Sequence, residues 1–361
     1  MPLRFIFGDQ GWNDGLNSWP VEPPFVAVNS VTPVRGTLGP SGTLSSEHNS
    51  NNRGFDSASN PRNYCRFVPT DDLPKVAVGG WGQMAATGNA RGPCPPCVRV
   101  TTDTQTRYYC FGPSQVSSGA VTEFGLYELA TSGTGNFTKI ATVVAATRND
   151  EWHFYELVAE LVGDNLEVEC WFDNALVLQD TVALVGIDGV IGWAGRTTWG
   201  ENTGAAALLH GGYVADYRVG PSLVQTSRPT AQGFHDEWSP AAAWADINNA
   251  TVTVDGIGGV DGDRTTYPVT AFDPDLGDNI VGLQTTIIGS RSPDAVPASL
   301  IRDHPATADE VAAEFEFIEV GAELIGWQAL ELDPHTSAPW QWADVADYQF
   351  GLQAFAPDPG E

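Results

Sequence analysis

The stretch Leu166-Glu-Val-Glu-Cys-Trp-Phe172 decides the fold class of this chain of 361 residues. Its apolar residues at positions 166, 168, 170 and 172 alternate with Glu167, Glu169 and Trp171. Successive side chains of a strand point to opposite faces of a sheet, so the alternation predicts a β-strand with one face buried.

Residues that favour tight turns lie on both sides of this strand. Gly163-Asp-Asn165 precedes it and Asp173-Asn174 follows it, and such residues accept the positive φ values of hairpin turns. The runs 152–161 and 175–181 are apolar enough to pair with the strand, which predicts a three-stranded antiparallel meander. Further strands are expected at 99–111, 121–129, 189–194 and 212–219, so the first half of the chain predicts a β-sandwich.

Composition supports an all-β chain. Gly and Pro number 39 and 25, together nearly 18% of the chain, whereas their average share is about 12%. Charged residues make up 17% of the chain, whereas their average share is about 25%. Many turns, few charges and 12 tryptophans favour sheets over helices that carry ion pairs. One short helix is expected at 339–346, with Ser337 as its cap and Pro339 in its first turn.

The length of the chain predicts two domains. Residues 221–238 include Pro221 and Pro229 and few large apolar side chains, which predicts a linker. The linker separates residues 1–220 from residues 239–361, where strands are expected at 278–288, 313–320, 324–332 and 347–355. The expected architecture is therefore two β-sandwich domains of the jelly-roll type joined by a short linker.

The charge balance argues against two classes of partner. The chain has 17 Lys and Arg against 45 Asp and Glu, a formal net charge of −28. Nucleic acids and anionic membrane surfaces attract clustered cations, whereas the cations of this chain are scattered singly. The sequence has neither the roughly 20 apolar residues of a membrane-spanning helix nor the pattern of a secretory signal. We expect synthesis in the cytoplasm, no nucleic-acid partner and no membrane insertion.

Three blocks of the first half resemble the laminin-G or concanavalin A-like jelly roll of tailed-bacteriophage structural proteins. The blocks are Asp150-Glu-Trp-His-Phe-Tyr-Glu-Leu157, residues 166–178, and Gly212-Tyr-Val-Ala-Asp-Tyr-Arg-Val219. The resemblance covers most of residues 1–220, although the Cys-rich segment 93–110 departs from the family pattern.

Blocks of the second half resemble a domain that follows the jelly roll in phage tail and virion proteins. One departure is Gln349, where the family usually has an acidic residue. The resemblance implies a virion component, either a tail fibre or tip protein or a capsid spike, with other virion proteins as partners and a homo-oligomeric assembly by analogy with fibres. The blocks are Trp238-Ser-Pro240, residues 245–250, residues 260–267, Glu331-Leu-Asp-Pro-His-Thr-Ser-Ala-Pro-Trp340 and Tyr348-Gln-Phe-Gly-Leu352.

A candidate glycan site lies in the Gly-rich segment 192–204. This segment contains Trp193 and Trp199, followed by Glu201 and Asn202. Aromatic rings at loops can stack on sugar rings, and jelly-roll lectins bind ligands through such rim loops. A place in the core between two sheets is the alternative for either tryptophan.

Asp261 and Asp263 form a candidate calcium site. They place carboxylates at i and i+2 in a Gly-rich loop, which suits the oxygen preference of Ca²⁺. An Asp-Gly turn that binds its own backbone explains the same residues without a metal. No other cofactor is expected.

Four cysteines form a candidate thiol cluster. Cys94 and Cys97 have the spacing of a zinc or redox pair, and Cys65 and Cys110 could complete four ligands. Buried thiols or a disulfide between two of the four is the interpretation that we favour over zinc.

Catalytic motifs are weak in this sequence. Retaining glycoside hydrolysis needs two carboxyl groups about 5 to 5.5 Å apart, and Glu167 and Glu169 share a face without the third acid of the usual pattern. We therefore expect a non-enzymatic virion protein that presents a lectin-like module for attachment to the host surface. The alternatives are a capsid decoration protein that packs on the shell and a glycan-cleaving hydrolase.

Overall fold

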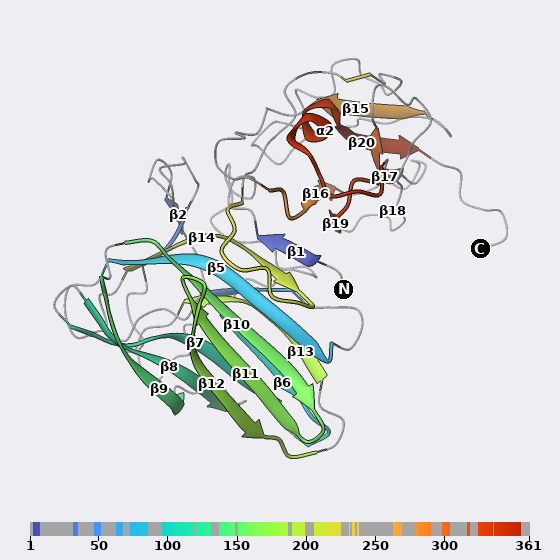
Figure 1. Cartoon of the computed structure of the whole chain (residues 1–361). Helices are drawn as coiled ribbons and strands as arrows, with labels where there is room; N and C mark the ends of the chain where they lie inside the picture. Colours follow the sequence, from blue (N-terminus) through green and yellow to red (C-terminus); the bar gives the residue numbers. More distant parts are fainter. Residues whose placement is uncertain are drawn as a thin grey trace. The chain divides into compact units, whose positions relative to one another are not determined.

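The computed structural model divides the chain into two compact units, Met1–Val224 (unit 1) and Gln225–Glu361 (unit 2). The described part of the chain is nearly all β, which confirms the predicted fold class (Figure 1). None of the described helices is long and apolar enough to cross a membrane. The structure describes the strands and the helix named below, together with residues 73–74, 102–104, 151–152, 163–164, 173–174, 184–186, 216–224, 231, 233–234, 237, 263, 279–282, 331–334, 336–341 and 348.

Unit 1 contains two antiparallel sheets. Sheet A has eight strands in the order β12-β11-β10-β5-β14-β3-β2, with β1 also paired to β14, and sheet B has six in the order β4-β13-β6-β7-β8-β9. Sheet A consists of β1 (Leu3–Phe7), β2 (Thr32–Val34), β3 (Glu47–Asn51), β5 (Lys75–Ala85), β10 (His153–Val162), β11 (Asn165–Phe172), β12 (Ala175–Ala183) and β14 (Ala206–Ala215), and sheet B of β4 (Asn63–Phe67), β6 (Pro96–Thr101), β7 (Thr106–Ser117), β8 (Ala120–Ala130), β9 (Phe137–Arg148) and β13 (Val190–Thr198).

The predicted meander is β10-β11-β12. Its turns have left-handed backbone angles, with φ of 59° at Gly163, 46° at Asp173 and 69° at Asn174. Two successive left-handed residues are the signature of a type I′ hairpin, whose twist matches that of the flanking strands. The turn residues therefore fix the register of all three strands.

The core of unit 1 lies between the two sheets. Tyr155 of β10 contacts Phe111 and Phe124 of sheet B, with ring centroids 6.1 and 6.3 Å apart. Leu166, Val168 and Cys170 are fully buried on the same side of sheet A, which confirms the predicted alternation along β11.

Two parts of unit 1 differ from the sequence prediction. The run 99–111 is a hairpin of β6 and β7 rather than one strand, and the Thr104 N–H donates to Thr102 Oγ1 (3.4 Å) in its turn. Strand β5 lies at the centre of sheet A but was not predicted, because it is rich in glycine. At Gly79 a Cβ atom would lie 2.6 Å from the Tyr213 ring and 2.7 Å from the Phe154 ring, so glycine leaves room for both rings.

Unit 2 contains two smaller sheets, in the orders β15-β20-β17-β18 and β16-β19. Its apolar cluster is formed by Trp340, Val345 and Tyr348. The predicted helix begins later than expected, since Ser337 has a φ of 55° and Gln341 is the N-cap residue. The elements are β15 (Arg264–Pro268), β16 (Leu283–Gly289), β17 (Ala298–Asp303), β18 (Glu316–Phe317), β19 (Leu324–Leu330), α2 (Trp342–Asp347) and β20 (Gln349–Ala354).

The later part of segment 221–238 is bound to unit 2. The Gly233 N–H donates to Thr266 O (2.7 Å), and the Glu237 N–H donates to Arg264 O (3.0 Å). Gln349 Oε1 accepts hydrogen bonds from the Phe234 N–H (2.6 Å) and the Thr266 hydroxyl (2.8 Å). The amide oxygen therefore serves as an acceptor at the position where the resembled family has an acid.

Candidate functional site

The outer face of sheet B combines aromatic, cationic and thiol side chains. Val98 and Phe111 are buried toward the core, so the residues that alternate with them in β6 and β7 occupy the outer face. The register pairs Trp193 of β13 with Arg99 of β6, and Arg99 with Tyr108 of β7. We call these three residues the aromatic row.

A second row crosses all six strands of sheet B beside the aromatic row. We call it the thiol row, because Cys97 and Cys110 face each other at its centre. Among the residues whose side chains the structure describes, the two rows place Arg99, Tyr108, Tyr127 and Lys139 on one face of one sheet. In strand order the thiol row is Arg66, Gly195, Cys97, Cys110, Tyr127 and Lys139.

Burial differs along this face. Cys97, Cys110 and Tyr127 are no more than 4% exposed, and the Tyr127 ring lies over Gly125, where a Cβ atom would be 2.9 Å from the ring. Arg99 and Tyr108 are half-buried, and Lys139 at the β9 edge is exposed. The face therefore has a covered centre beside residues that a ligand can reach.

The Arg99 guanidinium gives this face its electrostatic character. Its Nε atom is buried and makes no hydrogen bond within the part of the chain that the structure describes. Lys139, three strands away on β9, is paired with Glu123 through an Nζ–Oε1 distance of 2.8 Å. A desolvated donor without an acceptor is costly in a folded protein, and it is the feature most suggestive of a ligand here.

A buried carboxylate lies on the outer side of sheet A. Glu156 is fully buried and accepts hydrogen bonds from the Tyr213 hydroxyl and the Gly220 N–H (3.2 Å). Arg218 Nε lies 2.8 Å from Glu156 Oε2, and the same guanidinium lies 3.7 Å from the centroid of the Trp171 ring. Burial raises the pKa of the Glu156 carboxyl, while Arg218 and the Gly220 N–H act in the opposite direction.

The surroundings of Glu156 indicate a structural role. A carboxylate with a raised pKa is a candidate for catalysis when a cleft exposes it, but Glu156 is fully buried. Its partners hold residues 218–220 against sheet A, and the Trp81 Nε1–H bond to Ser222 O (2.7 Å) continues the attachment. Glu156 therefore fixes the last described segment of unit 1.

No model of a known protein family matches the chain, and no curated protein shows significant sequence similarity to it. Solved structures with a similar arrangement include the endo-β-1,4-glucuronan lyase of the fungus Trichoderma reesei (TM-score 0.39, 12% identity, 62% of this chain and 100% of that one). Another is the potassium-bound carbohydrate recognition domain of Emp46p (TM-score 0.32, 10% identity, 45% and 81%). A third is the CBM2 module of the evolved Dit protein of Lactobacillus casei BL23 phage J-1 (TM-score 0.28, 11% identity, 55% and 82%). At these scores and identities the likenesses assign neither a ligand nor a reaction to this chain.

The predicted glycan residues have different positions in the structure. Trp193 lies within β13, which extends to Thr198, and not in a rim loop as expected. Trp199, Glu201 and Asn202 lie outside the described residues, so their contact with a glycan stays a prediction.

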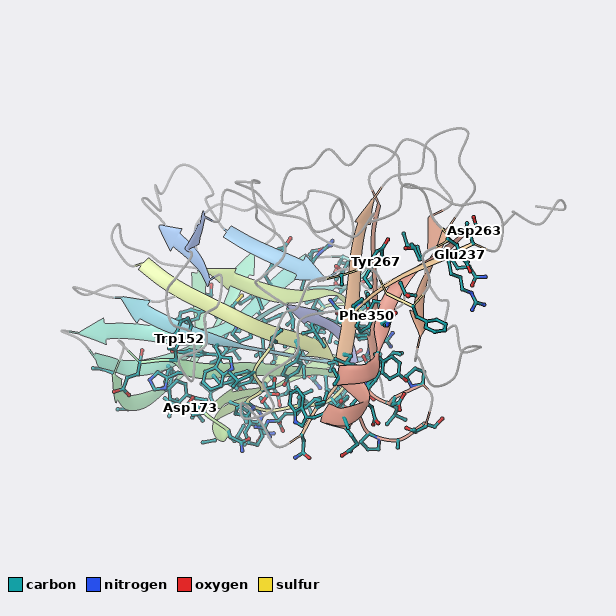
Figure 2. The ribbon with its side chains drawn as sticks, turned by 90° about the horizontal axis from the view of Figure 1, so that it is seen from above. Trp152, Asp173, Glu237, Asp263, Tyr267 and Phe350 are labelled. Carbon is teal, nitrogen blue, oxygen red and sulfur yellow. The ribbon has the colours of Figure 1, made fainter. Side chains whose placement is uncertain are left out.

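The predicted calcium site is only partly described. Asp263 lies beside Glu237 in unit 2 (Figure 2), and Asp261 lies outside the described residues. Glu237 Oε2 accepts a hydrogen bond from the Arg264 N–H (2.6 Å), so this carboxylate has a structural partner. The described residues contain no group of three or more potential metal ligands, and calcium at Asp261 and Asp263 stays a prediction.

The structure describes the predicted cysteine cluster only in part. Cys97 and Cys110 are directly opposed on the outer face of sheet B. The backbone of Cys65 in β4 pairs with that of Arg196 in β13. Cys94 lies outside the described residues, so a cluster of all four cysteines, as thiols, as a disulfide or as a zinc site, stays a prediction.

Thiol reactivity provides a direct check of this arrangement. Cys97, Cys110 and Cys170 are buried thiols, and the chain has five cysteines. We expect a water-soluble thiol reagent to modify at most two cysteines of the native protein, and all five after unfolding under reducing conditions. Rapid modification of Cys97 or Cys110 in the native state, read by peptide mass spectrometry, would contradict the covered centre of the face.

The predicted carboxylate pair lies on the other sheet. Glu167 and Glu169 are on the outer side of sheet A, where the Trp171 Nε1–H donates to Glu169 Oε2 (3.0 Å). Arg99 and Tyr108 were not predicted as site residues, because the β6–β7 hairpin was expected to be one strand. Tyr127 lies in β8, within the expected strand 121–129, but was not predicted as a site residue. The alternation of Val98, Arg99 and Val100 is the signal that could have placed Arg99 outside.

Proposed function

We propose that unit 1 is a carbohydrate-binding module that binds glycan on the outer face of sheet B without cleaving it. The observation that carries this proposal is the aromatic row, in which Arg99 lies between Trp193 and Tyr108 on adjacent strands. Aromatic rings offer apolar faces for sugar rings, and phenol and guanidinium groups offer hydrogen bonds to their polar substituents. Neighbouring strands are about 4.8 Å apart, so a glycan chain can cross several of them.

We also propose that the chain is a virion structural protein that presents this module to the host surface. The resemblance of both halves to phage structural proteins supports this location. Each module would bind its glycan weakly, and many copies on one particle would increase the overall affinity of the particle for the host surface. The capsid decoration alternative predicts tens to hundreds of copies per particle, whereas a tail fibre or tip protein predicts few. Counting the chain in purified particles by quantitative mass spectrometry separates the two.

Substitution of the aromatic row tests the binding site. Trp193→Ala and Tyr108→Ala are each expected to weaken glycan binding by about tenfold, since a stacked aromatic ring contributes about 1 to 1.5 kcal/mol. The measurement is a glycan array followed by calorimetry with the best ligand. Phe234→Ala, which removes a ring that is 57% exposed in unit 2, is the matched control and should bind as the wild type does.

Two results would contradict this proposal. If the full-length protein binds no glycan on the array, unit 1 is not a carbohydrate-binding module. If both aromatic variants bind with unchanged affinity, the binding site is not on the outer face of sheet B. Trp199→Ala tests the separate prediction of a rim-loop contact. Release of reducing or unsaturated sugar from a bound glycan would replace the binding module by an enzyme, and loss of hydrolysis in Glu169→Gln would assign it to the predicted carboxylate pair.

A further inference from the structure

We infer that the outer face of sheet B selects glycans that carry carboxylate groups, and that Arg99 is the residue that binds the carboxylate. The inference rests on the proposed function and adds the chemical class of the ligand. It is carried by the buried Nε–H of Arg99, which makes no hydrogen bond with any described residue.

The position of Arg99 suits a planar anion. Arg99 is the fourth residue of β6, and the register places Trp193 on one side of it and Tyr108 on the other. The arginine side chain is half-buried, so its Nε–H has lost water while the rest of the side chain remains partly accessible. A carboxylate can accept parallel hydrogen bonds from the Nε–H and an Nη–H of one guanidinium. Such a ligand would satisfy the donor that the protein leaves without an acceptor.

The charge distribution indicates that this contact is local. The chain has a net charge of −28, so the long-range field of the protein repels an anionic polysaccharide. The outer face of sheet B nevertheless has Arg99 and Lys139 at its register positions. Its acidic residue Glu123 is paired with Lys139. Binding of a polyanion therefore requires specific contacts at this face and cannot come from overall attraction.

A neutral sugar satisfies the same site less well. The aromatic row can stack on charged and uncharged sugars alike, so it does not distinguish them. The Nε–H forms its strongest hydrogen bond with an ionised acceptor. A site with a buried donor discriminates against ligands that do not pair with it, so methyl esterification of the ligand should weaken binding.

The experiment compares carboxylated glycans with matched neutral and anionic polymers. Full-length protein is titrated with polygalacturonate and hyaluronate, with fully methyl-esterified polygalacturonate, and with dextran sulfate and poly(glycerol phosphate). The variants are Arg99→Met, which removes the donor, and Arg99→Lys, which keeps a charge without the planar fork. Lys75→Gln is the matched control, because Lys75 is a cation of sheet A that is paired with Glu160. Urea unfolding of each variant is measured in parallel.

We expect a carboxylated glycan to bind at least tenfold more tightly than its methyl ester and than the sulfated and phosphorylated polymers. Arg99→Met should remove this preference, and Arg99→Lys should restore only part of it. Arg99→Met should also unfold at the same or a higher urea concentration than the wild type, because the variant no longer buries a donor without an acceptor. Lys75→Gln should leave binding unchanged.

Several outcomes would overturn the inference while leaving the proposed function intact. Three of them concern binding: equal affinity for the acid and its ester, a preference for sulfated or phosphorylated polymers, and unchanged selectivity in Arg99→Met. The fourth is a marked loss of stability in Arg99→Met, which would show that Arg99 stabilises the fold. Failure of the protein to bind any polymer or any arrayed glycan would instead overturn the proposed function itself.

Discussion

Glu156→Ala is expected to lower the free energy of unfolding of unit 1 by about 3 kcal/mol, the usual effect of removing one partner from a buried ion pair. The carboxylate is fully buried, and the Tyr213 hydroxyl and the Gly220 N–H both donate to it. Alanine would leave these two donors without an acceptor. Arg218 would remain stacked on Trp171. Urea unfolding followed by near-ultraviolet circular dichroism measures the change.

Two further variants make this result specific. Glu156→Gln keeps an oxygen acceptor for Tyr213 and Gly220 and is expected to cost about 1 kcal/mol. Glu167→Ala removes an exposed glutamate from the neighbouring strand β11 and should change stability by less than about 0.5 kcal/mol. If Glu156→Ala were no more harmful than Glu167→Ala, the attachment of residues 218–220 would not depend on this carboxylate.

The pH dependence of stability gives a second readout at Glu156. Burial raises the pKa of this carboxyl above its ordinary value of 4.5, so the folded state binds the proton more tightly than the unfolded chain. The extra stability that comes from the raised pKa of Glu156 is therefore complete below pH 4.5 and is lost as the pH rises through the folded pKa. The stability of the wild type relative to Glu156→Gln should fall with pH in this range. A difference that rises with pH would show that Arg218 dominates over burial.

Asp333→Ala is expected to destabilise unit 2 by about 3 kcal/mol. Asp333 is buried, and its carboxylate accepts hydrogen bonds from the Tyr348 hydroxyl and from Thr336 Oγ1 (2.8 Å). The Ser337 N–H donates to Asp333 O (2.8 Å), so this residue organises the turn that leads to Trp340. Alanine would leave a buried phenol without its acceptor next to the Trp340 ring, whose centroid lies 5.0 Å from that of Tyr348.

Hydrogen exchange read by mass spectrometry can localise this loss. We expect faster exchange in α2 and β20 of Asp333→Ala, with peptides of unit 1 as the internal reference. Asp344→Ala, which removes an acidic residue from the first turn of α2, should cost no more than about 0.5 kcal/mol. Wild-type exchange rates in β20 of Asp333→Ala would mean that the turn forms without this carboxylate.

The fold of unit 1 could be predicted where local patterns carry the information. The alternation along 166–172 and the turns at Gly163 and Asp173-Asn174 were sufficient for the meander. Strand β5 could not be predicted, since its Gly79 is required by the Tyr213 and Phe154 rings, which come from distant parts of the chain. Its place in the sheet depends on tertiary contacts that the local sequence does not contain.

The candidate site was harder to predict than the fold. Trp193 was chosen for its aromatic ring in a Gly-rich segment, but its neighbours Arg99 and Tyr108 depend on the pairing of β13, β6 and β7. Likewise, the spacing of the cysteines suggested a cluster, whereas the direct opposition of Cys97 and Cys110 depends on the pairing of β6 and β7. The register between strands that are not joined by a tight turn is a property of their pairing, and no single stretch of sequence specifies it.

The neutral side chain at position 349 affects how unit 2 responds to acid. Gln349 Oε1 joins the Phe234 N–H to the Thr266 hydroxyl, and an amide does not titrate in the range where carboxylates take up protons. An ionised glutamate at this position would add one more negative charge to the chain. On protonation, one of its acceptor oxygens would become a hydroxyl group. The glutamine keeps the junction between Phe234, Thr266 and β20 unchanged in mildly acidic surroundings.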